Sequence, residues 1–128
     1  FVHGRSGMGK SVLIQTFLEE IQRLQQTVVL TGRCYEQESV PFKALDSLID
    51  SLADHLGKLP TETVRQGIPE DSLPLVRLFP VMGKIPGMTD AGKPAIDNVD
   101  QQELRQRAMN ALRDLLNWLS IQHPVVLY

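Results

Sequence analysis

The chain has 128 residues, of which 42% are hydrophobic and 22% charged. This composition is typical of one folded domain and excludes the disordered, fibrous and disulfide-rich classes. The net charge of −2 provides no basic field for nucleic acid or an anionic membrane. No apolar run approaches the roughly 18 residues that a membrane span needs, and no signal peptide opens the chain. From the charge and the lack of an apolar span, we expect no direct binding to nucleic acid or membrane. The single cysteine, Cys34, cannot form an internal disulfide, so we expect a cytoplasmic protein.

The first third of the sequence predicts a strand, a helix and a second strand. Residues 1–3 have the character of the end of a buried strand. Apolar residues recur at spacings of three and four between residues 9 and 25, which predicts an amphipathic helix. Residues 27–35 read TVVLTGRCY and have no helical period, so they predict a second buried strand. Because only three residues precede the loop and the last four are mostly apolar, we expect a domain cut at both ends.

Residues 4–11 between the first strand and the helix read GRSGMGKS, which fits the P-loop pattern G-x-x-x-x-G-K-[ST]. Glycines allow a tight turn whose backbone N–H groups cradle phosphate, and the start of the following helix also attracts anions. We predict that Lys10 reaches the β and γ phosphates as the catalytic residue and that the Ser11 hydroxyl binds Mg²⁺. The predicted nucleotide-binding residues are Gly4, Arg5, Ser6, Gly7, Met8, Gly9, Lys10, Ser11 and Val12. The alternative interpretation is a glycine-rich turn without a ligand, and the loop does not discriminate ATP from GTP.

The rest of the sequence is mostly helical. Ser39 and Pro41 predict the start of a helix with an apolar stripe, which Gly57 ends. Residues 57–71 have two prolines and little period, and residues 72–79 predict a short helix that stops at Pro80. Residues 80–98 are rich in glycine and proline, which predicts an exposed loop. A capping-box-like pair, Asp100 and Glu103, then starts a helix of about five turns, and residues 125–128 begin a third strand.

The strand, loop, helix and strand, followed by TGRCYEQESVPFKALDSLIDSL, resemble the AAA-like, STAND-type regulatory ATPases, also described as origin-recognition-complex-like AAA domains. Residues 72–82 and residues 102–127 are similar to the helices of that group and to its approach to the Walker B strand. The resemblance implies an α/β P-loop NTPase fold with three α/β/α layers and a mostly parallel sheet. Residues 1–128 would then be a partial ATPase domain, from Walker A to the start of Walker B, with a helix-rich insert between the second and third strands.

The same resemblance implies a regulatory switch that binds ATP and Mg²⁺, hydrolyses ATP, and belongs to a larger bacterial signalling protein. Its partners would be effector domains of the same chain, with a serine/threonine kinase or a transcription regulator favoured, and nucleotide could drive self-association. Walker B, sensor and arginine-finger residues would lie after Tyr128. Two alternatives stay open: a P-loop phosphotransferase acting on a small metabolite, and a degenerate scaffold that binds nucleotide weakly or not at all.

A few charged residues outside the loop are candidates for contacts with the ligand. Arg33, Glu36 and Glu38 lie at the end of the second predicted strand, where ligands bind in open α/β sheets, although a solvated loop is the simpler interpretation. Arg105 and Arg107 could contact phosphate or a partner from the last helix, with a solvated helix face as the alternative.

The histidines and the tryptophan have structural interpretations. His3, His55 and His123 lack the spacing of a metal site, so the sequence predicts no metal cluster. Trp118 has apolar neighbours near the end of the last helix, which favours a core position over a cofactor platform.

Overall fold

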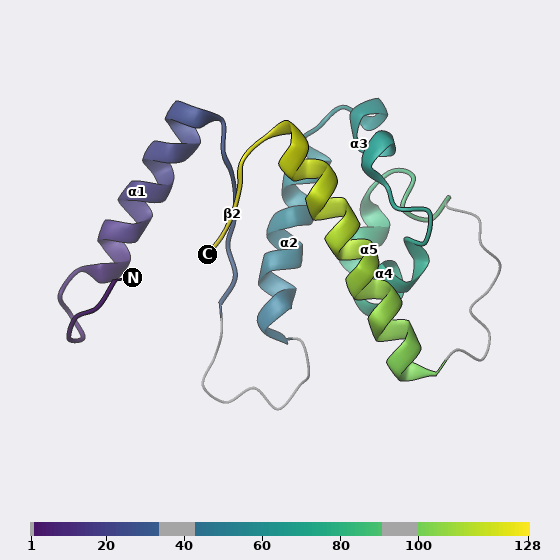
Figure 1. Cartoon of the computed structure of the whole chain (residues 1–128), viewed down its shortest axis with the longest axis horizontal. Helices are drawn as coiled ribbons and strands as arrows, with labels where there is room; N and C mark the ends of the chain where they lie inside the picture. Colours follow the sequence, from purple (N-terminus) through teal and green to yellow (C-terminus); the bar gives the residue numbers. More distant parts are fainter. Residues whose placement is uncertain (1, 34–42, 91–99) are drawn as a thin grey trace.

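A computed structural model describes residues 2–33, 43–90 and 100–128. The elements are α1 (Lys10–Gln25), β1 (Val28–Leu30), α2 (Lys43–Gly57), α3 (Thr61–Gly67), α4 (Leu73–Leu78), the 3-10 helix η1 (Pro80–Lys84), α5 (Gln101–Gln122) and β2 (Val125–Leu127). In Figure 1, α1 lies on one side of the strands, and α2 and the later helices lie on the other. None of the helices in these ranges is both long and apolar enough to cross a membrane.

The two strands pair in parallel, with Val28 opposite Val125 and Leu30 opposite Leu127. The Gly32 N–H continues the pairing beyond β1 by donating to the Tyr128 carbonyl at 2.6 Å. The predicted α/β class with parallel pairing is thus confirmed, whereas the three-layer architecture and the larger sheet stay predictions. The second strand, predicted for residues 27–35, is observed at Val28–Leu30; residues 31–33 are described and are not part of it, and residues 34 and 35 lie outside the described part.

The strand predicted for residues 1–3 is not present at residues 2 and 3. Val2 is 47% exposed, and the described pair of strands does not include it. An apolar residue forms a buried strand only where a neighbouring strand accepts its backbone hydrogen bonds.

Helix α1 confirms the predicted amphipathic pattern, but the described elements cover only half of its apolar stripe. Leu18 is buried at 7% exposure. Leu13, Phe17 and Leu24 belong to the same stripe and are 64%, 58% and 65% exposed. Helical residues three and four apart share a face. One side of the stripe, with Leu18, therefore packs toward β1, and the other side, with Leu13, Phe17 and Leu24, is exposed along the length of the helix.

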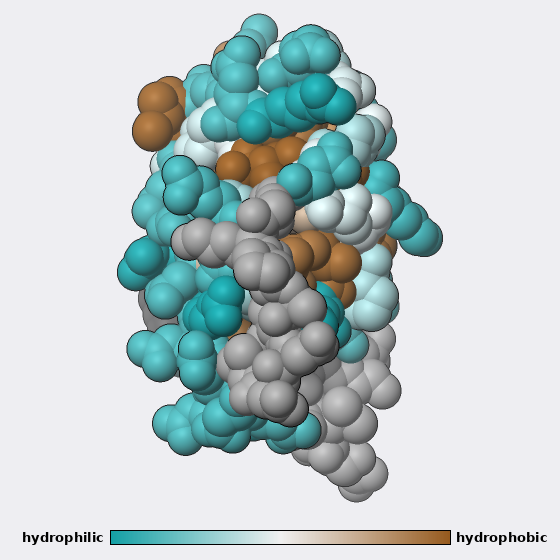
Figure 2. Space-filling view, turned by 90° about the vertical axis from the view of Figure 1, so that its right-hand side faces the viewer, coloured by the Kyte–Doolittle hydropathy of each residue, from teal (hydrophilic) through white to brown (hydrophobic). Residues whose placement is uncertain are grey.

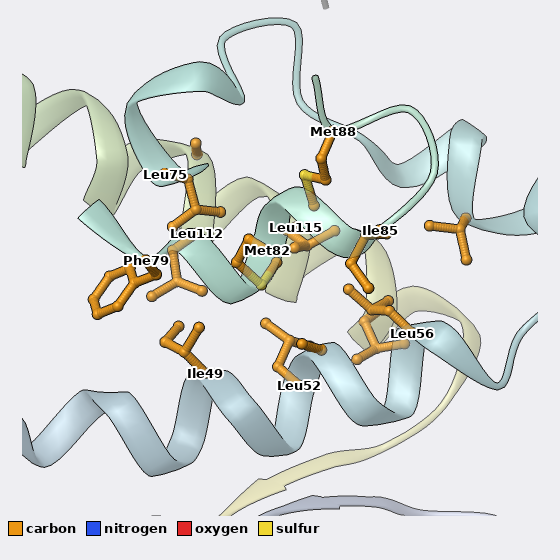
Figure 3. Packing of buried hydrophobic residues seen from close by; sticks show 14 of the residues in the cluster. Ile49, Leu52, Leu56, Leu75, Phe79, Met82, Ile85, Met88, Leu112 and Leu115 are labelled. Atoms are coloured by element: carbon orange, nitrogen blue, oxygen red, sulfur yellow. The ribbon is translucent and has the colours of Figure 1, made fainter. Parts of the chain in front are cut away.

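The main hydrophobic core lies between α2 and the helical segments that follow it. Ile49, Leu52 and Leu56 project from one face of α2, as the predicted stripe required, and are at most 1% exposed. Figure 3 shows them facing side chains from α4, η1 and α5, among them Met82 and Leu115. Burial of this apolar surface provides the main favourable term in folding.

The loop predicted at residues 80–98 is wrong for its first part, residues 80–90, and residues 91–99 lie outside the described part. Pro80–Lys84 forms η1, and Met82, Ile85 and Met88 are 0%, 4% and 0% exposed. The buried Ser72 hydroxyl donates to the Met88 carbonyl at 2.7 Å and fixes this turn against α4. The glycines and prolines therefore shape a packed turn.

Residues 57–71 contain helix α3, which was not predicted from the sequence. The helix has seven residues, and Val64 is the one large apolar side chain that it buries. One apolar residue cannot produce a helical period, so the helical conformation of this segment depends on its packing against the rest of the protein. In Figure 2, the α3 side of the molecule is mainly hydrophilic, with small hydrophobic areas between polar side chains.

Helix α5 begins one residue after Asp100 and ends before His123, close to the predicted bounds. Asp100 occupies the N-cap position, but its side chain makes no capping hydrogen bond, so the predicted capping box does not form. Arg107 donates two hydrogen bonds of 2.7 Å to Asp71, which joins α5 to the turn before α4. This bidentate pair gives Arg107 a structural partner in place of the predicted phosphate contact or solvated face.

Two serines of α2 occupy the edge of β1 that faces away from β2. The Arg33 N–H donates to Ser47 Oγ at 2.8 Å, and the Thr31 N–H donates to Ser51 Oγ at 3.3 Å. Gly32, between them, points to β2, because alternate residues of an extended chain direct their N–H groups to opposite edges. Serines four residues apart on α2 thus satisfy two successive N–H groups of this edge.

We expect Ser47→Ala to lower the free energy of unfolding by about 1 kcal/mol, because it removes one hydrogen bond to backbone. Ser51→Ala should cost less, since its bond is 3.3 Å long against 2.8 Å for Ser47. Urea unfolding of both variants measures the difference. An equal loss, or none in Ser47→Ala, would contradict the role given to these serines.

Candidate functional site

The P-loop segment turns on two glycines. Gly7 and Gly9 have φ of 80° and 79°, in the left-handed region that side chains with a Cβ rarely adopt. The Met8 N–H donates to the Arg5 carbonyl at 3.4 Å across this turn. The third predicted glycine, Gly4, is different: its φ is not positive, and an added Cβ would make only ordinary contacts, with the Lys10 side chain at 3.5 Å and with the Met8 Cβ at 3.8 Å. Two of the three glycines are therefore needed for the backbone conformation.

Helix α1 starts directly after the turn, with Gly9 as N-cap. The first bond that involves the cap runs from the Leu13 N–H to the Gly9 carbonyl at 3.0 Å. The N–H groups of Lys10, Ser11 and Val12 precede this bond, and no side chain caps the helix. No acidic residue lies in the first turn, so the positive end of the helix dipole is not neutralised locally. The arrangement provides N–H donors and a favourable dipole for an anion.

The Lys10 side chain folds back over the loop. Its Nζ donates to the Arg5 carbonyl at 2.7 Å, and its aliphatic part lies against Gly4. The ammonium group is thus held within the same turn as the backbone donors. A phosphate bound at the turn would lie within the positive field of this group.

Ser11 opens onto a cavity of about 970 Å³ between α1 and the strands. Its lining includes Thr31, Gly32 and Arg33, which follow β1, and Tyr128, which follows β2. Ligands of open α/β sheets bind outside the carboxyl ends of the strands, and the cavity lies at that end. Its volume is within the usual range for small-molecule sites, about 300–1,000 Å³.

The Ser11 hydroxyl is exposed and lines this cavity, so it fits the role of an oxygen ligand for Mg²⁺. Mg²⁺ normally takes only one or two protein oxygens and completes its shell with substrate phosphates and water. The donor set available at the start of α1 is therefore compatible with a metal–nucleotide complex.

The structure brings the predicted residues Ser11 and Arg33 to one cavity. Glu36 and Glu38 lie outside the described residues, as does Cys34. Arg105 and Arg107 lie on α5 and are not part of this lining. Trp118 packs against the core, as predicted.

Several lining residues had no signal in the sequence, among them Ser47 of α2 and the helix residues Gln15, Glu19 and Gln22. Thr31, Gly32 and Tyr128 follow strand ends, so the rule for the carboxyl ends of parallel strands could have found them. His55 and His123, far apart in the sequence, line another recess together.

The whole chain, residues 1–128, matches the family described as "AAA ATPase domain". No curated protein and no solved structure matches the chain. The match extends over the P-loop, the helices and the final strand, and it agrees with the anion-binding geometry at the start of α1. The predicted resemblance to AAA-type P-loop ATPases is thereby confirmed, and the chain belongs to the AAA ATPase domain family.

Proposed function

We propose that this domain binds ATP with Mg²⁺ and acts as a nucleotide-dependent switch within a larger cytoplasmic signalling protein. The observation that carries the proposal is the P-loop turn, where left-handed Gly7 and Gly9 lead into an uncapped helix start. The triphosphate would accept hydrogen bonds from the N–H groups of Lys10, Ser11 and Val12, while the Lys10 ammonium compensates its charge.

In this proposal Lys10, Ser11 and Arg33 each have one task. Lys10 exchanges its 2.7 Å bond to the Arg5 carbonyl for the β and γ phosphates. Ser11 would supply a hydroxyl ligand to Mg²⁺, and the ion would help to neutralise the charge of the phosphates. Arg33 lines the cavity beyond Ser11 and adds positive charge near the strand ends.

A switch function also needs a second state. Nucleotide would order the loop around the phosphates, and effector domains of the same chain, with a kinase or transcription regulator favoured, would respond to that ordering. Nucleotide-dependent self-association would be one output. The membership in the AAA family supports nucleotide binding of the ATPase type, and the regulatory role goes beyond it.

Ser11→Ala tests the assignment of the metal ligand. We expect the affinity for Mg²⁺·ATP to fall roughly two- to tenfold, because one hydroxyl interaction is lost, and the affinity for ATP without Mg²⁺ to stay constant. Isothermal titration with ATP and GTP, each with and without Mg²⁺, measures both quantities.

Ser120→Ala is the matched control, since the Ser120 hydroxyl donates to the Asn117 carbonyl within α5 and does not line the cavity. Equal losses with and without Mg²⁺ would remove Ser11 from the metal site. Failure of the unmodified protein to bind any nucleotide would overturn the proposal and favour a scaffold. Release of ADP only in the presence of a small-metabolite acceptor would favour a phosphotransferase.

A further inference from the structure

A second recess lies at the other end of the strands from the P-loop. Its volume is about 460 Å³, and its lining comes from the ends of α1 and α2, the start of β1, and the residue that follows α5. The residues important here are Thr27 before β1, Asp54, His55 and Lys58 at the end of α2, and His123 after α5. Figure 1 shows the ends of these three helices at the same side of the molecule, away from the P-loop.

Two enclosed polar atoms at this recess have no hydrogen-bond partner in the described structure. They are Oγ1 of Thr27 and Nε2 of His55. Thr27 is 6% exposed, so its hydroxyl is enclosed together with the rest of the residue. A neutral imidazole can leave a ring nitrogen as an unused acceptor at moderate cost. An imidazolium cannot, because both ring nitrogens become donors and the enclosed charge requires solvation.

The charges around His55 also oppose its protonation. Burial lowers the pKa of His55 below its ordinary value of 6.5, and His123 and Lys58 lower it further. Asp54, on the same helix, is the carboxylate in the lining, and it is exposed, so solvent screens its attraction. The residues that α1 contributes, Gln22 and Gln26, are uncharged. The negative end of the α2 dipole favours an imidazolium, but the net direction is downward.

We propose that this recess is an acid-sensitive joint, in which neutral His55 holds the last turn of α2 against the start of β1 and protonation separates them. Nε2 is closed to solvent in this conformation, so a proton on it requires its surroundings to move and admit water, and the recess between α2 and β1 lies beside it. The joint lies away from the nucleotide site and does not depend on the proposed function.

The direction of the pH effect follows from proton binding. Because the pKa of His55 is lower in the folded protein, the unfolded chain binds more protons in mild acid. The contribution of His55 to stability is complete above pH 6.5, decreases as the pH falls below 6.5, and is lost once the folded pKa is passed. One proton can change the folding equilibrium constant by at most about tenfold per pH unit.

The test compares unfolding of the full chain in urea between pH 7.5 and pH 5 for the unmodified protein and His55→Gln. The folding equilibrium constant of the unmodified protein should fall up to about tenfold more per pH unit than that of His55→Gln. His3→Gln, at the P-loop end, is the control, and its folding equilibrium constant should depend on pH as strongly as that of the unmodified protein. If the stability of His55→Gln depends on pH as strongly as that of the unmodified protein, the proposal is overturned.

A second measurement covers the case in which His55→Gln does not fold. The His55 imidazole should titrate below 6.5 by NMR, and His123→Gln should move this midpoint upward. Amide hydrogen exchange, corrected for the intrinsic rate, should increase in acid at residues 27–28 and 54–58 and not at core residues 112–115 of α5. A midpoint at or above 6.5, or protection that does not change with pH, contradicts the joint.

Discussion

Replacement of Gly67 by alanine is expected to destabilise the protein by about 1–3 kcal/mol, the usual cost of forcing extra volume into a packed site. Gly67 is the last residue of α3 and is buried against α5. A Cβ built there would overlap with Cδ2 and Cε3 of the Trp118 indole. The indole is rigid and packs against the core, so either the ring or α3 has to move.

The helix propensity of alanine works in the opposite direction, by about 0.5–1 kcal/mol, and the steric conflict should exceed it. Gly57→Ala provides a matched control, because Gly57 also ends a helix and an added Cβ would meet nothing within 4 Å. Urea unfolding should show a loss for Gly67→Ala and no loss, or a small gain, for Gly57→Ala. Similar stabilities for the two variants would contradict the prediction and show that the Trp118 side chain can move aside at little cost.

Lys10→Ala should weaken ATP binding roughly ten- to a hundredfold, which corresponds to the loss of about 1.5–3 kcal/mol for hydrogen bonds to charged groups. The Lys10 ammonium is held in the loop by its 2.7 Å bond to the Arg5 carbonyl, beside the backbone N–H groups at the start of α1. Isothermal titration of the full protein measures the change in affinity.

Lys58→Ala is the control for a general charge effect, since Lys58 is exposed and lies on the opposite recess. Its affinity for ATP should be unchanged. Lys10 is partly exposed and not part of the core, so its variant should unfold at the same urea concentration as the unmodified protein. An unchanged affinity in Lys10→Ala would remove the central residue of the proposed site.

The features predictable from the sequence were those that depend on short-range pattern. The P-loop could be identified because its chemistry needs glycine, lysine and serine at fixed spacing, and the turn adopts positive φ at Gly7 and Gly9. Helices α2 and α5 repeat apolar residues over several turns, so their burial follows from the helical period. Strand β2 follows a proline and consists of β-branched and apolar residues.

The features that could not be predicted depend on contacts between distant segments. Met82 and Met88 are fully buried although they lie among glycines and prolines, because Ser72 and the α2 face hold that turn. The pairing of Arg107 with Asp71 spans 36 positions and leaves no local pattern. The orientation of α1 toward β1 was equally invisible, since a periodic stripe indicates which face is apolar and not how much of it a neighbour covers.

The hydrogen bonds from Thr31 and Arg33 to α2 also determine how this sheet can associate with other chains. Parallel strands recruit partners through the free N–H and C=O groups of an outer edge, as in β-augmentation and in edge-to-edge aggregation. Ser51 and Ser47 already occupy the N–H groups beyond β1, and the body of α2 lies beside them. An incoming strand would have to displace a helix that contributes Ile49, Leu52 and Leu56 to the core. Growth of the sheet is therefore directional, and any additional strand has to join on the side of β2.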